Sequence, residues 1–259
     1  MRGVSDPERT MASVRLLGAV CAVASDGSLI DLPSASQRRL LAILALHSPR
    51  RLRSEWLADT LEISPGALRT SVSRVRATIG SAMLEKASTG YAFVGDVDAL
   101  LFCRAVADVA DADAEDRVRA LEHALELWNG PALEEFAGEE WADGEIARLT
   151  EIHAGTADDL AGALIEARRP ADAVALLEQH IVRYPYRDRP RGLLIRALAG
   201  SGRQADALRA FQQYRALLID EFGTDPSPEV IRIERRVATG WNGIESAATA
   251  IATKGPGGP

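Results

Sequence analysis

The N-terminal part of the chain changes from one hydrophobic spacing to another near Ser34. Residues 12–33 alternate apolar with polar positions on both sides of the hairpin signal Asp26-Gly27, which predicts short strands. From Ser34 to Pro49 the leucines fall at helical spacing and end at a proline, which predicts a first helix. A second, shorter helix is expected over residues 55–61.

The next segment carries the strongest helix signals in the chain. Ser64 is suited to be the N-cap and Pro65 the first helical residue, while Gly80 is suited to end the helix. Within residues 65–79 the apolar residues share one face, and they are Leu68, Val72, Val75 and Ile79. This segment is therefore predicted to be an amphipathic helix with one buried face.

A β-hairpin is expected after this helix. Residues 83–85 and 91–94 have the character of strands on either side of a turn at Ser88-Thr89-Gly90. The resulting order of strands, three helices and a hairpin is that of a winged helix with an additional N-terminal sheet. Residues 12–97 are therefore predicted to form a winged-helix DNA-binding domain.

The second half of the chain is predicted to be helical throughout, and it contains an internal repeat. Residues 169–174 and 203–208 share the pattern Arg-x-Ala-Asp-Ala-aliphatic at an offset of 34 residues. This offset is the period of tetratricopeptide repeats, in which a small alanine lets two helices approach closely. Further helices are expected over residues 100–110, 117–128 and 228–237.

These patterns predict a mainly α protein with a small β portion. Its fold is expected to be an N-terminal winged helix-turn-helix followed by an all-α, TPR-like helical domain. The helical domain is expected over residues 98–245. Residues 246–259 are rich in alanine, threonine, glycine and proline, and they are expected to form a disordered tail.

Charge divides the chain in the same place as periodicity. The whole chain of 259 residues has a formal net charge of −7. Residues 12–97 hold ten basic and seven acidic residues, a balance of +3, whereas residues 98–259 carry −10. The two halves are therefore expected to face different partners, although +3 is a small balance for a DNA-binding domain.

The helix over residues 65–79 is the candidate for base recognition. The sequence has no aspartate or glutamate between Ser64 and Gly80, so no acid there repels phosphates. The residues expected to read bases are Arg69, Thr70, Ser73 and Arg76. Arginine, serine and threonine suit the base edges of the major groove, and the neighbouring Arg74 is expected to reach phosphate. The alternative is a solvated basic face on an ordinary helix.

Further residues are expected to hold the phosphate backbone of DNA. They are Lys86 and Thr89 in the hairpin and Arg53 before the second helix. Gly90 is expected to allow the turn, and Tyr91 to be a core residue. Two arginine groups, Arg38-Arg39 and Arg50-Arg51-Arg53, flank the first helix and are open to three interpretations: DNA contact, a solvated rim, or ion pairs with the acidic second half.

The sequence offers no enzyme motif. It lacks the glycine-rich phosphate loops, the zinc-protease helix motif and the nucleophile elbow. Its four histidines have no metal-ligand spacing, so no catalytic residue, metal or cofactor is expected. No apolar run reaches membrane-spanning length, and Cys21 and Cys103 suit reduced thiols. A cytoplasmic protein without membrane contact is therefore expected.

Several segments resemble the SARP-type antibiotic regulatory proteins of actinomycetes. In the first half they are Val14-Arg15-Leu16-Leu17-Gly18, residues 37–42, residues 71–76 and Gly90-Tyr91. In the second half, residues 124–131 resemble the family's ALxLWxGP segment, residues 201–208 its SGRQAEAL segment and residues 221–229 its ELGxxPxPE ending. The resemblance covers the chain from about Val14 to Trp241.

The resemblance implies an OmpR-type winged helix joined to a bacterial transcriptional activation domain (BTAD). It implies a regulator of secondary metabolism that binds double-stranded DNA at direct repeats near promoters and helps RNA polymerase to start. Self-association on DNA is a further expectation. The chain departs from the family at residues 61–65, which replace a longer loop between the second and third helices. The resemblance therefore supports DNA binding by this chain more strongly than it supports contact with RNA polymerase.

Two functions remain open at this point. The first is a sequence-specific transcription regulator of the activator type, although repression is also compatible with the sequence. The alternative is a protein–protein interaction module that uses the TPR-like groove and carries a degenerate winged helix. The small positive balance of residues 12–97 and the shortened loop at residues 61–65 favour the alternative.

Overall fold

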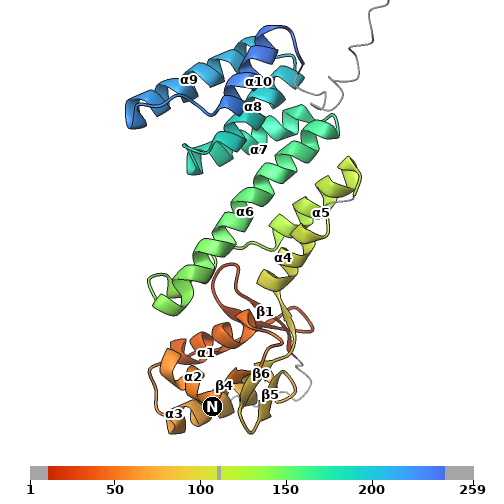
Figure 1. Cartoon of the computed structure of the whole chain (residues 1–259). Helices are drawn as coiled ribbons and strands as arrows, with labels where there is room; N and C mark the ends of the chain where they lie inside the picture. The colour runs from red at the N-terminus through yellow and green to blue at the C-terminus, as the bar shows by residue number, and fades with distance from the viewer. Residues whose placement is uncertain (1–10, 110–111, 243–259) are drawn as a thin grey trace, which may run out of the picture. The chain divides into compact units, whose positions relative to one another are not determined.

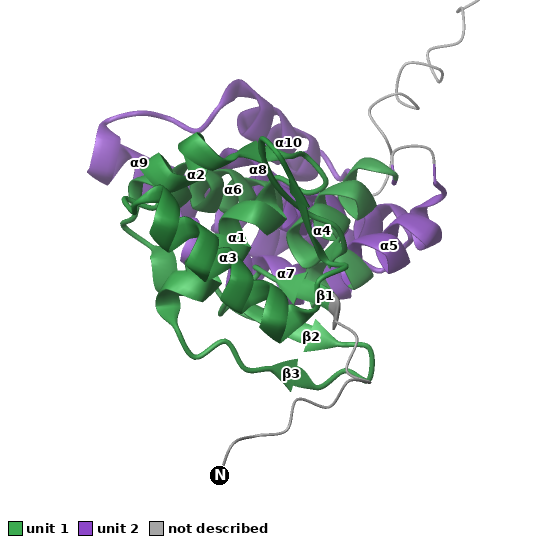
Figure 2. Ribbon diagram, turned by 90° about the horizontal axis from the view of Figure 1, so that it is seen from below, with its two compact units in different colours: residues 1–108, 123–153 green, residues 109–122, 154–259 purple. Residues whose placement is uncertain are grey.

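The computed structural model of the chain describes residues 11–109 and 112–242 (Figure 1). The fold has two compact units that do not follow sequence order (Figure 2). Unit 1 joins the residues up to 108 with residues 123–153, and unit 2 joins residues 109–122 with those from 154 onward. The domain division after residue 97 stays a prediction, and the tail expected at 246–259 lies outside the described residues.

Unit 1 contains two small sheets and the three expected helices. The first sheet has the order β3-β2-β1-β7, with β1 at Met11–Arg15, β2 at Cys21–Ala24, β3 at Leu29–Ile30 and β7 at Asp96–Val97. The second has the order β4-β6-β5, with β4 at Leu52–Arg53, β5 at Leu84–Ala87 and β6 at Gly90–Phe93. The helices are α1 at Ala35–Leu46, α2 at Ser54–Thr60 and α3 at Pro65–Ile79.

This order confirms the predicted strands, three helices and hairpin, and the mainly α fold with a small β portion. The strands β4 and β7 were not predicted, because two residues are too few to show an alternating pattern and, unlike the two-residue β3, neither follows a hairpin signal such as Asp26-Gly27. In the first sheet, β7 pairs in parallel with β1, so the strand that leads into the second half belongs to the N-terminal sheet.

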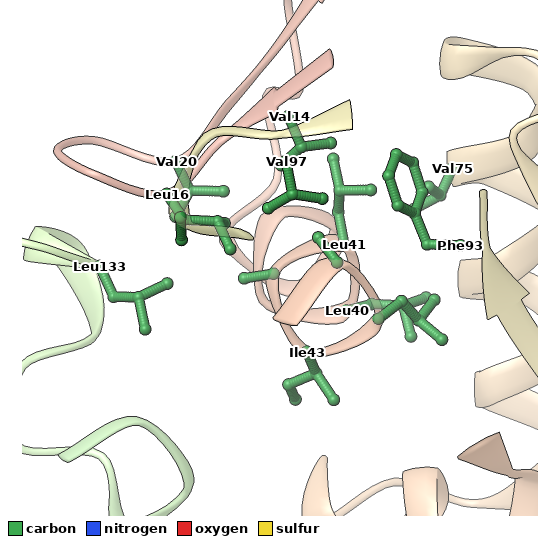
Figure 3. Packing of buried hydrophobic residues seen from close by; sticks show 14 of the residues in the cluster. Val14, Leu16, Val20, Leu40, Leu41, Ile43, Val75, Phe93, Val97 and Leu133 are labelled. Carbon is green, nitrogen blue, oxygen red and sulfur yellow. The ribbon is translucent and has the colours of Figure 1, made fainter. Parts of the chain in front are cut away.

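The helix α3 has the bounds that its sequence predicts. Ser64 Oγ accepts a hydrogen bond from the Ala67 N–H at 3.2 Å, and Gly80 follows the helix with φ 96°. The apolar face is buried, as expected, at Leu68, Val72, Val75 and Ile79. Figure 3 shows this core around α1, with Val75 and Phe93 on one side and Val14 and Val97 on another.

Gly90 has a different role from the one that the sequence suggested. It does not adopt a positive φ, so the turn does not require glycine there. Instead, β4 passes so close that a Cβ on Gly90 would lie 1.9 Å from the Leu52 carbonyl oxygen. The expectation that Gly90 serves the turn is therefore wrong: glycine is needed because two strands approach each other. Tyr91, next in the chain, is buried as expected.

Replacing Gly90 with alanine is therefore expected to break the pairing of β4 with β6. The added methyl group meets backbone atoms, which cannot rotate away as a flexible side chain would. We expect the free energy of unfolding to fall by about 1–3 kcal/mol, measured by urea denaturation. The matched control is Gly80→Ala, which has no atom within 4 Å of the added Cβ but has φ 96°. Equal losses in both variants would show that β4 can shift aside.

The winged helix and the start of the second half share one core. The helix α4 at Asp98–Ala107 follows β7, and α5 spans Ala114–Glu126. A 3-10 turn at Glu134–Phe136 and the first part of α6, Glu140–Glu166, continue the chain. Leu133 and Phe136 belong to the same buried cluster as α1 and α3, and Figure 3 shows Leu133 beside α1.

Backbone hydrogen bonds reinforce this shared core. The N–H groups of Asn129 and Leu133 donate to the carbonyls of Leu17 and Leu16, each at 2.8 Å. The ALxLWxGP-like segment at residues 124–131 therefore joins the loop after β1. Its physical role in this chain is to attach the start of the second half to the winged helix.

One buried carboxylate holds the loop after β1 from the other side. Asp98 is 7% exposed and accepts from Leu16 N–H at 2.7 Å, Leu17 N–H at 3.1 Å and Ala99 N–H at 2.7 Å. Burial raises the pKa of Asp98 above its ordinary value, and these three N–H donors oppose that rise. Asp98 thus connects the start of α4 to the N-terminal sheet.

Unit 2 contains the predicted repeat. Its remaining helices are α7 at Pro170–Arg183, α8 at Asp188–Gly200, α9 at Gln204–Phe222 and α10 at Pro228–Ala238 (Figure 1). Successive helices pack against each other as helical hairpins. In the repeat, Ala173 and Leu177 of α7 and Ala207 and Phe211 of α9 are all buried.

The repeat extends to the helix starts. Arg169, the residue just before α7, donates from Nε to Asp172 in the first turn of that helix at 2.7 Å. Arg203, just before α9, donates in the same way to Asp206 at 2.7 Å. The same local ion pair therefore begins both helices, 34 residues apart. The TPR-like prediction for this part of the chain is confirmed.

Two further expectations from the sequence concern membrane-spanning helices and the state of the cysteines. Over the described ranges 11–109 and 112–242, no helix has the length and apolarity that crossing a bilayer requires. Cys21 and Cys103 are free thiols, and both are half-buried.

Candidate nucleic-acid interface

The outward face of α3 presents the residues expected to read bases. Arg69, Thr70 and Ser73 are exposed, and so is Arg74. Arg69 and Ser73 are four residues apart and therefore lie one turn apart on the same stripe of the helix. The opposite face of α3 is buried in the core, so this stripe is fixed relative to the winged helix.

The two exposed arginines of α3 are free to bind a ligand. Across residues 11–109 and 112–242, no carboxylate forms an ion pair with Arg69 or Arg74. Thr70 donates its hydroxyl proton to the Gly66 carbonyl at 3.2 Å, which leaves the oxygen lone pairs as acceptors. The face therefore offers two unpaired cations and two hydroxyl groups, and a major groove accepts this chemistry.

Arg76 is placed differently from the other three expected base readers. It is half-buried, and its guanidinium donates to the carbonyl of Leu84 in β5. This hydrogen bond joins the recognition helix to the hairpin. Base reading by Arg76 stays a prediction, and in this structure the side chain fixes α3 against β5.

The hairpin and β4 bring together the residues expected to contact phosphate. Lys86 and Thr89 are exposed, and the Thr89 carbonyl accepts from the Ser54 N–H at 3.1 Å. Arg53 lies opposite Gly90 in the β4–β6 pair. Arg53 and Thr89 therefore lie at the same end of the second sheet, next to the β5–β6 turn, while Lys86 lies on β5.

The structure selects among the three interpretations of Arg38 and Arg39. Arg38 Nε donates to both Glu135 oxygens, at 3.0 and 2.8 Å, and Arg39 lies 2.5 Å from Glu139. These are ion pairs with the start of the second half, which was one of the three interpretations. Arg51 pairs with Glu85 at 3.3 Å.

Trp56 is an exposed aromatic residue beside these arginines that is absent from the site residues predicted from the sequence. Its side chain is 43% exposed, and its ring lies 5.6 Å from that of His47, centroid to centroid. The signal was available: Leu57, Ala58 and Leu61 form the buried face here, so Trp56 falls on the polar side of α2. Tryptophan is enriched among the residues that dominate binding interfaces, so Trp56 is a candidate contact residue.

Known proteins share this architecture. The chain matches the family described as bacterial transcriptional activator domain over residues 97–238. It is 33% identical over 222 residues to the regulatory protein AfsR of Streptomyces griseus, covering 81% of this chain and 23% of that protein. It is 32% identical over 209 residues to the transcriptional regulator RedD of Streptomyces coelicolor, covering 73% of this chain and 60% of that protein.

A solved structure is similar as well. The structure of Mycobacterium tuberculosis EmbR in complex with a low affinity phosphopeptide matches with a TM-score of 0.82 at 26% identity. The match covers 95% of this chain and 70% of that chain. The chain spans 23% of AfsR and 60% of RedD, so it corresponds to a part of each of these relatives.

Proposed function

The chain belongs to the bacterial transcriptional activator domain family and is a SARP-type regulator, and we propose that it binds specific DNA sequences and activates transcription. The observation that carries this proposal is the outward face of α3. It has no acidic residue and presents two arginines that form no ion pair with any residue in 11–109 or 112–242, on a helix whose other face is buried in the core. Promoter DNA is cytoplasmic in bacteria, so we also place the protein in the cytoplasm.

In the proposed mechanism, phosphate contacts place the protein and α3 reads the sequence. Arg53, Lys86 and Thr89 hold the backbone on the hairpin side, and Arg74 holds it beside α3. Arg69, Thr70 and Ser73 then face the base edges of the major groove. The ion-paired Arg38 and Arg39 take no part, because their charge is used within unit 1.

Arg76→Ala tests the separate role that the structure gives to this residue. Loss of its hydrogen bond to Leu84 is expected to lower the free energy of unfolding by about 1 kcal/mol. DNA affinity should fall for all sequences alike, because α3 is held less firmly against the hairpin. A fluorescence-anisotropy panel of single-base variants of a bound site measures this. If discrimination is lost at one base position while stability is unchanged, Arg76 reads a base after all.

The polymerase contact is assigned to a hollow of about 610 Å³ beside the α2–α3 turn. Its lining is mainly acidic and aromatic, with Asp59, Glu62, Glu139, Glu140, Trp56 and Trp141, and it also includes Arg39, which pairs with Glu139. The shortened turn supplies Glu62, and the start of α6 supplies Glu140 and Trp141. An acidic surface with two tryptophans suits a basic segment of a partner protein. Self-association of two copies on direct repeats is part of the same proposal.

Selection of fragments from sheared genomic DNA of the encoding organism tests the proposal. The purified chain is mixed with the fragments at near-physiological salt and with excess nonspecific competitor, because salt sets nonspecific affinity. Recovery of a few promoter fragments that share a direct repeat supports a sequence-specific regulator. Recovery of nothing above background favours the interaction module with a degenerate winged helix.

A further inference from the structure

A second, smaller hollow lies in the winged helix between the end of α1 and the start of α2. Its volume is about 270 Å³, and its lining residues are His47, Arg50, Arg51, Leu52, Arg53 and Trp56. We call it the 47–56 hollow. Three arginines within four positions give it a positive lining, and low-dielectric walls concentrate such a field on an anion.

Two of the three arginines are available to a ligand. Arg50 and Arg53 are exposed, and no carboxylate in the described part of the chain forms an ion pair with either of them. Arg51 pairs with Glu85 at 3.3 Å, but both side chains are about half exposed, at 47% and 54%. Solvent weakens such a pair. The planar guanidinium fork matches the oxygens of a phosphate group.

The other side of the hollow is aromatic and apolar. Trp56 is 43% exposed, and its ring stands at 66° to that of His47. His47 Nδ1 lies 2.9 Å from the Ile43 carbonyl oxygen. This contact favours the tautomer with the proton on Nδ1, which leaves Nε2 to accept a hydrogen bond from a ligand hydroxyl. The hollow therefore combines cations, an acceptor and a flat aromatic surface.

We propose that the 47–56 hollow binds a nucleoside phosphate. Arg50 and Arg53 hold the phosphate group, and the indole of Trp56 stacks on the base. A DNA duplex would use only part of this lining, because its bases are paired and stacked and none is free to meet Trp56. The concave shape also suits a small ligand better than the broad surface of a duplex. The proposal does not depend on base reading by α3, but it shares Arg53 with the proposed DNA backbone contact, so a nucleotide and a DNA duplex would compete for Arg53.

Isothermal titration calorimetry of the full chain tests the proposal with four probes. They are guanosine 5′-monophosphate, adenosine 5′-monophosphate, ribose 5-phosphate and inorganic phosphate, so that the two nucleotides and ribose 5-phosphate carry the same single phosphate. At least one nucleotide is expected to bind about tenfold more tightly than ribose 5-phosphate, because stacking on Trp56 adds to the phosphate contact. Arg50→Ala is expected to weaken nucleotide binding about tenfold. Trp56→Leu should abolish the preference for nucleotide over ribose 5-phosphate.

Arg74→Ala is the matched control, because Arg74 is also an exposed, unpaired arginine but lies on α3. This variant should bind nucleotides as the wild type does and bind DNA more weakly. If no nucleotide binds at millimolar concentration while duplex DNA binding falls in Arg50→Ala, the proposal is overturned and the hollow belongs to the DNA backbone. Equal affinity for nucleotides and inorganic phosphate contradicts it as well, because Trp56 then contributes nothing.

Discussion

Replacing Arg69 and Arg74 together with alanine is expected to lower the affinity for a promoter site about a hundredfold. Both side chains are exposed on the outward face of α3 and have no acidic partner among the described residues. Neither contributes to the core, so the fold should remain intact. Arg69 loses a contact to a base edge, worth about 1–3 kcal/mol, and Arg74 loses a contact to phosphate.

The single variants separate these two contributions. Arg69→Ala should relax specificity at one base position. Arg74→Ala should weaken binding to DNA of every sequence, and it should lower the slope of log affinity against log salt by about one. Fluorescence anisotropy at several salt concentrations measures both effects. The control is Arg232→Ala, which removes an exposed arginine from α10 in unit 2. Unchanged affinity in the double variant would mean that α3 is not the recognition helix.

The helix α3 could be predicted to the residue because its determinants are local. Ser64, Pro65 and Gly80 fix its ends through hydrogen bonds and backbone angles within one turn, and four apolar residues fix its buried face. The exposed arginines could then be predicted, because they occupy helix positions outside that buried face. The repeat in unit 2 was predictable for a similar reason, since each helix pair repeats the same short-range contacts.

Features that depend on distant residues could not be predicted from the sequence. The need for glycine at position 90 comes from Leu52, and a Gly-Tyr pair after a turn looks the same whether or not another strand passes beside it. Ion pairing of Arg38 depends on Glu135, 97 residues away. The candidate recognition helix is therefore predictable from the sequence, whereas the neighbouring arginines that remain free for DNA are not.

Asp98 also depends on residues that are distant in the sequence. Asp98 accepts hydrogen bonds from the N–H groups of Leu16 and Leu17, which lie 82 and 81 positions earlier in the chain. Leu16 and Leu17 are fully buried, so water cannot replace the carboxylate as their partner. The same two residues supply the carbonyls that bind Leu133 and Asn129. One loop thus connects the N-terminal sheet, α4 and the start of the second half.

Asp98→Ala is accordingly expected to lower the free energy of unfolding by about 3 kcal/mol, because two buried N–H groups lose their acceptor. Asp98→Asn should lower the free energy of unfolding by less, because the carbonyl oxygen of asparagine still accepts one hydrogen bond. Its amide group is a donor and cannot accept from the other N–H. Urea denaturation followed by circular dichroism measures both losses. Asp96→Ala is the control, because Asp96 is an exposed aspartate on β7, two residues before Asp98. If Asp98→Ala unfolds at the same urea concentration as Asp96→Ala, the loop after β1 is held by its packing alone.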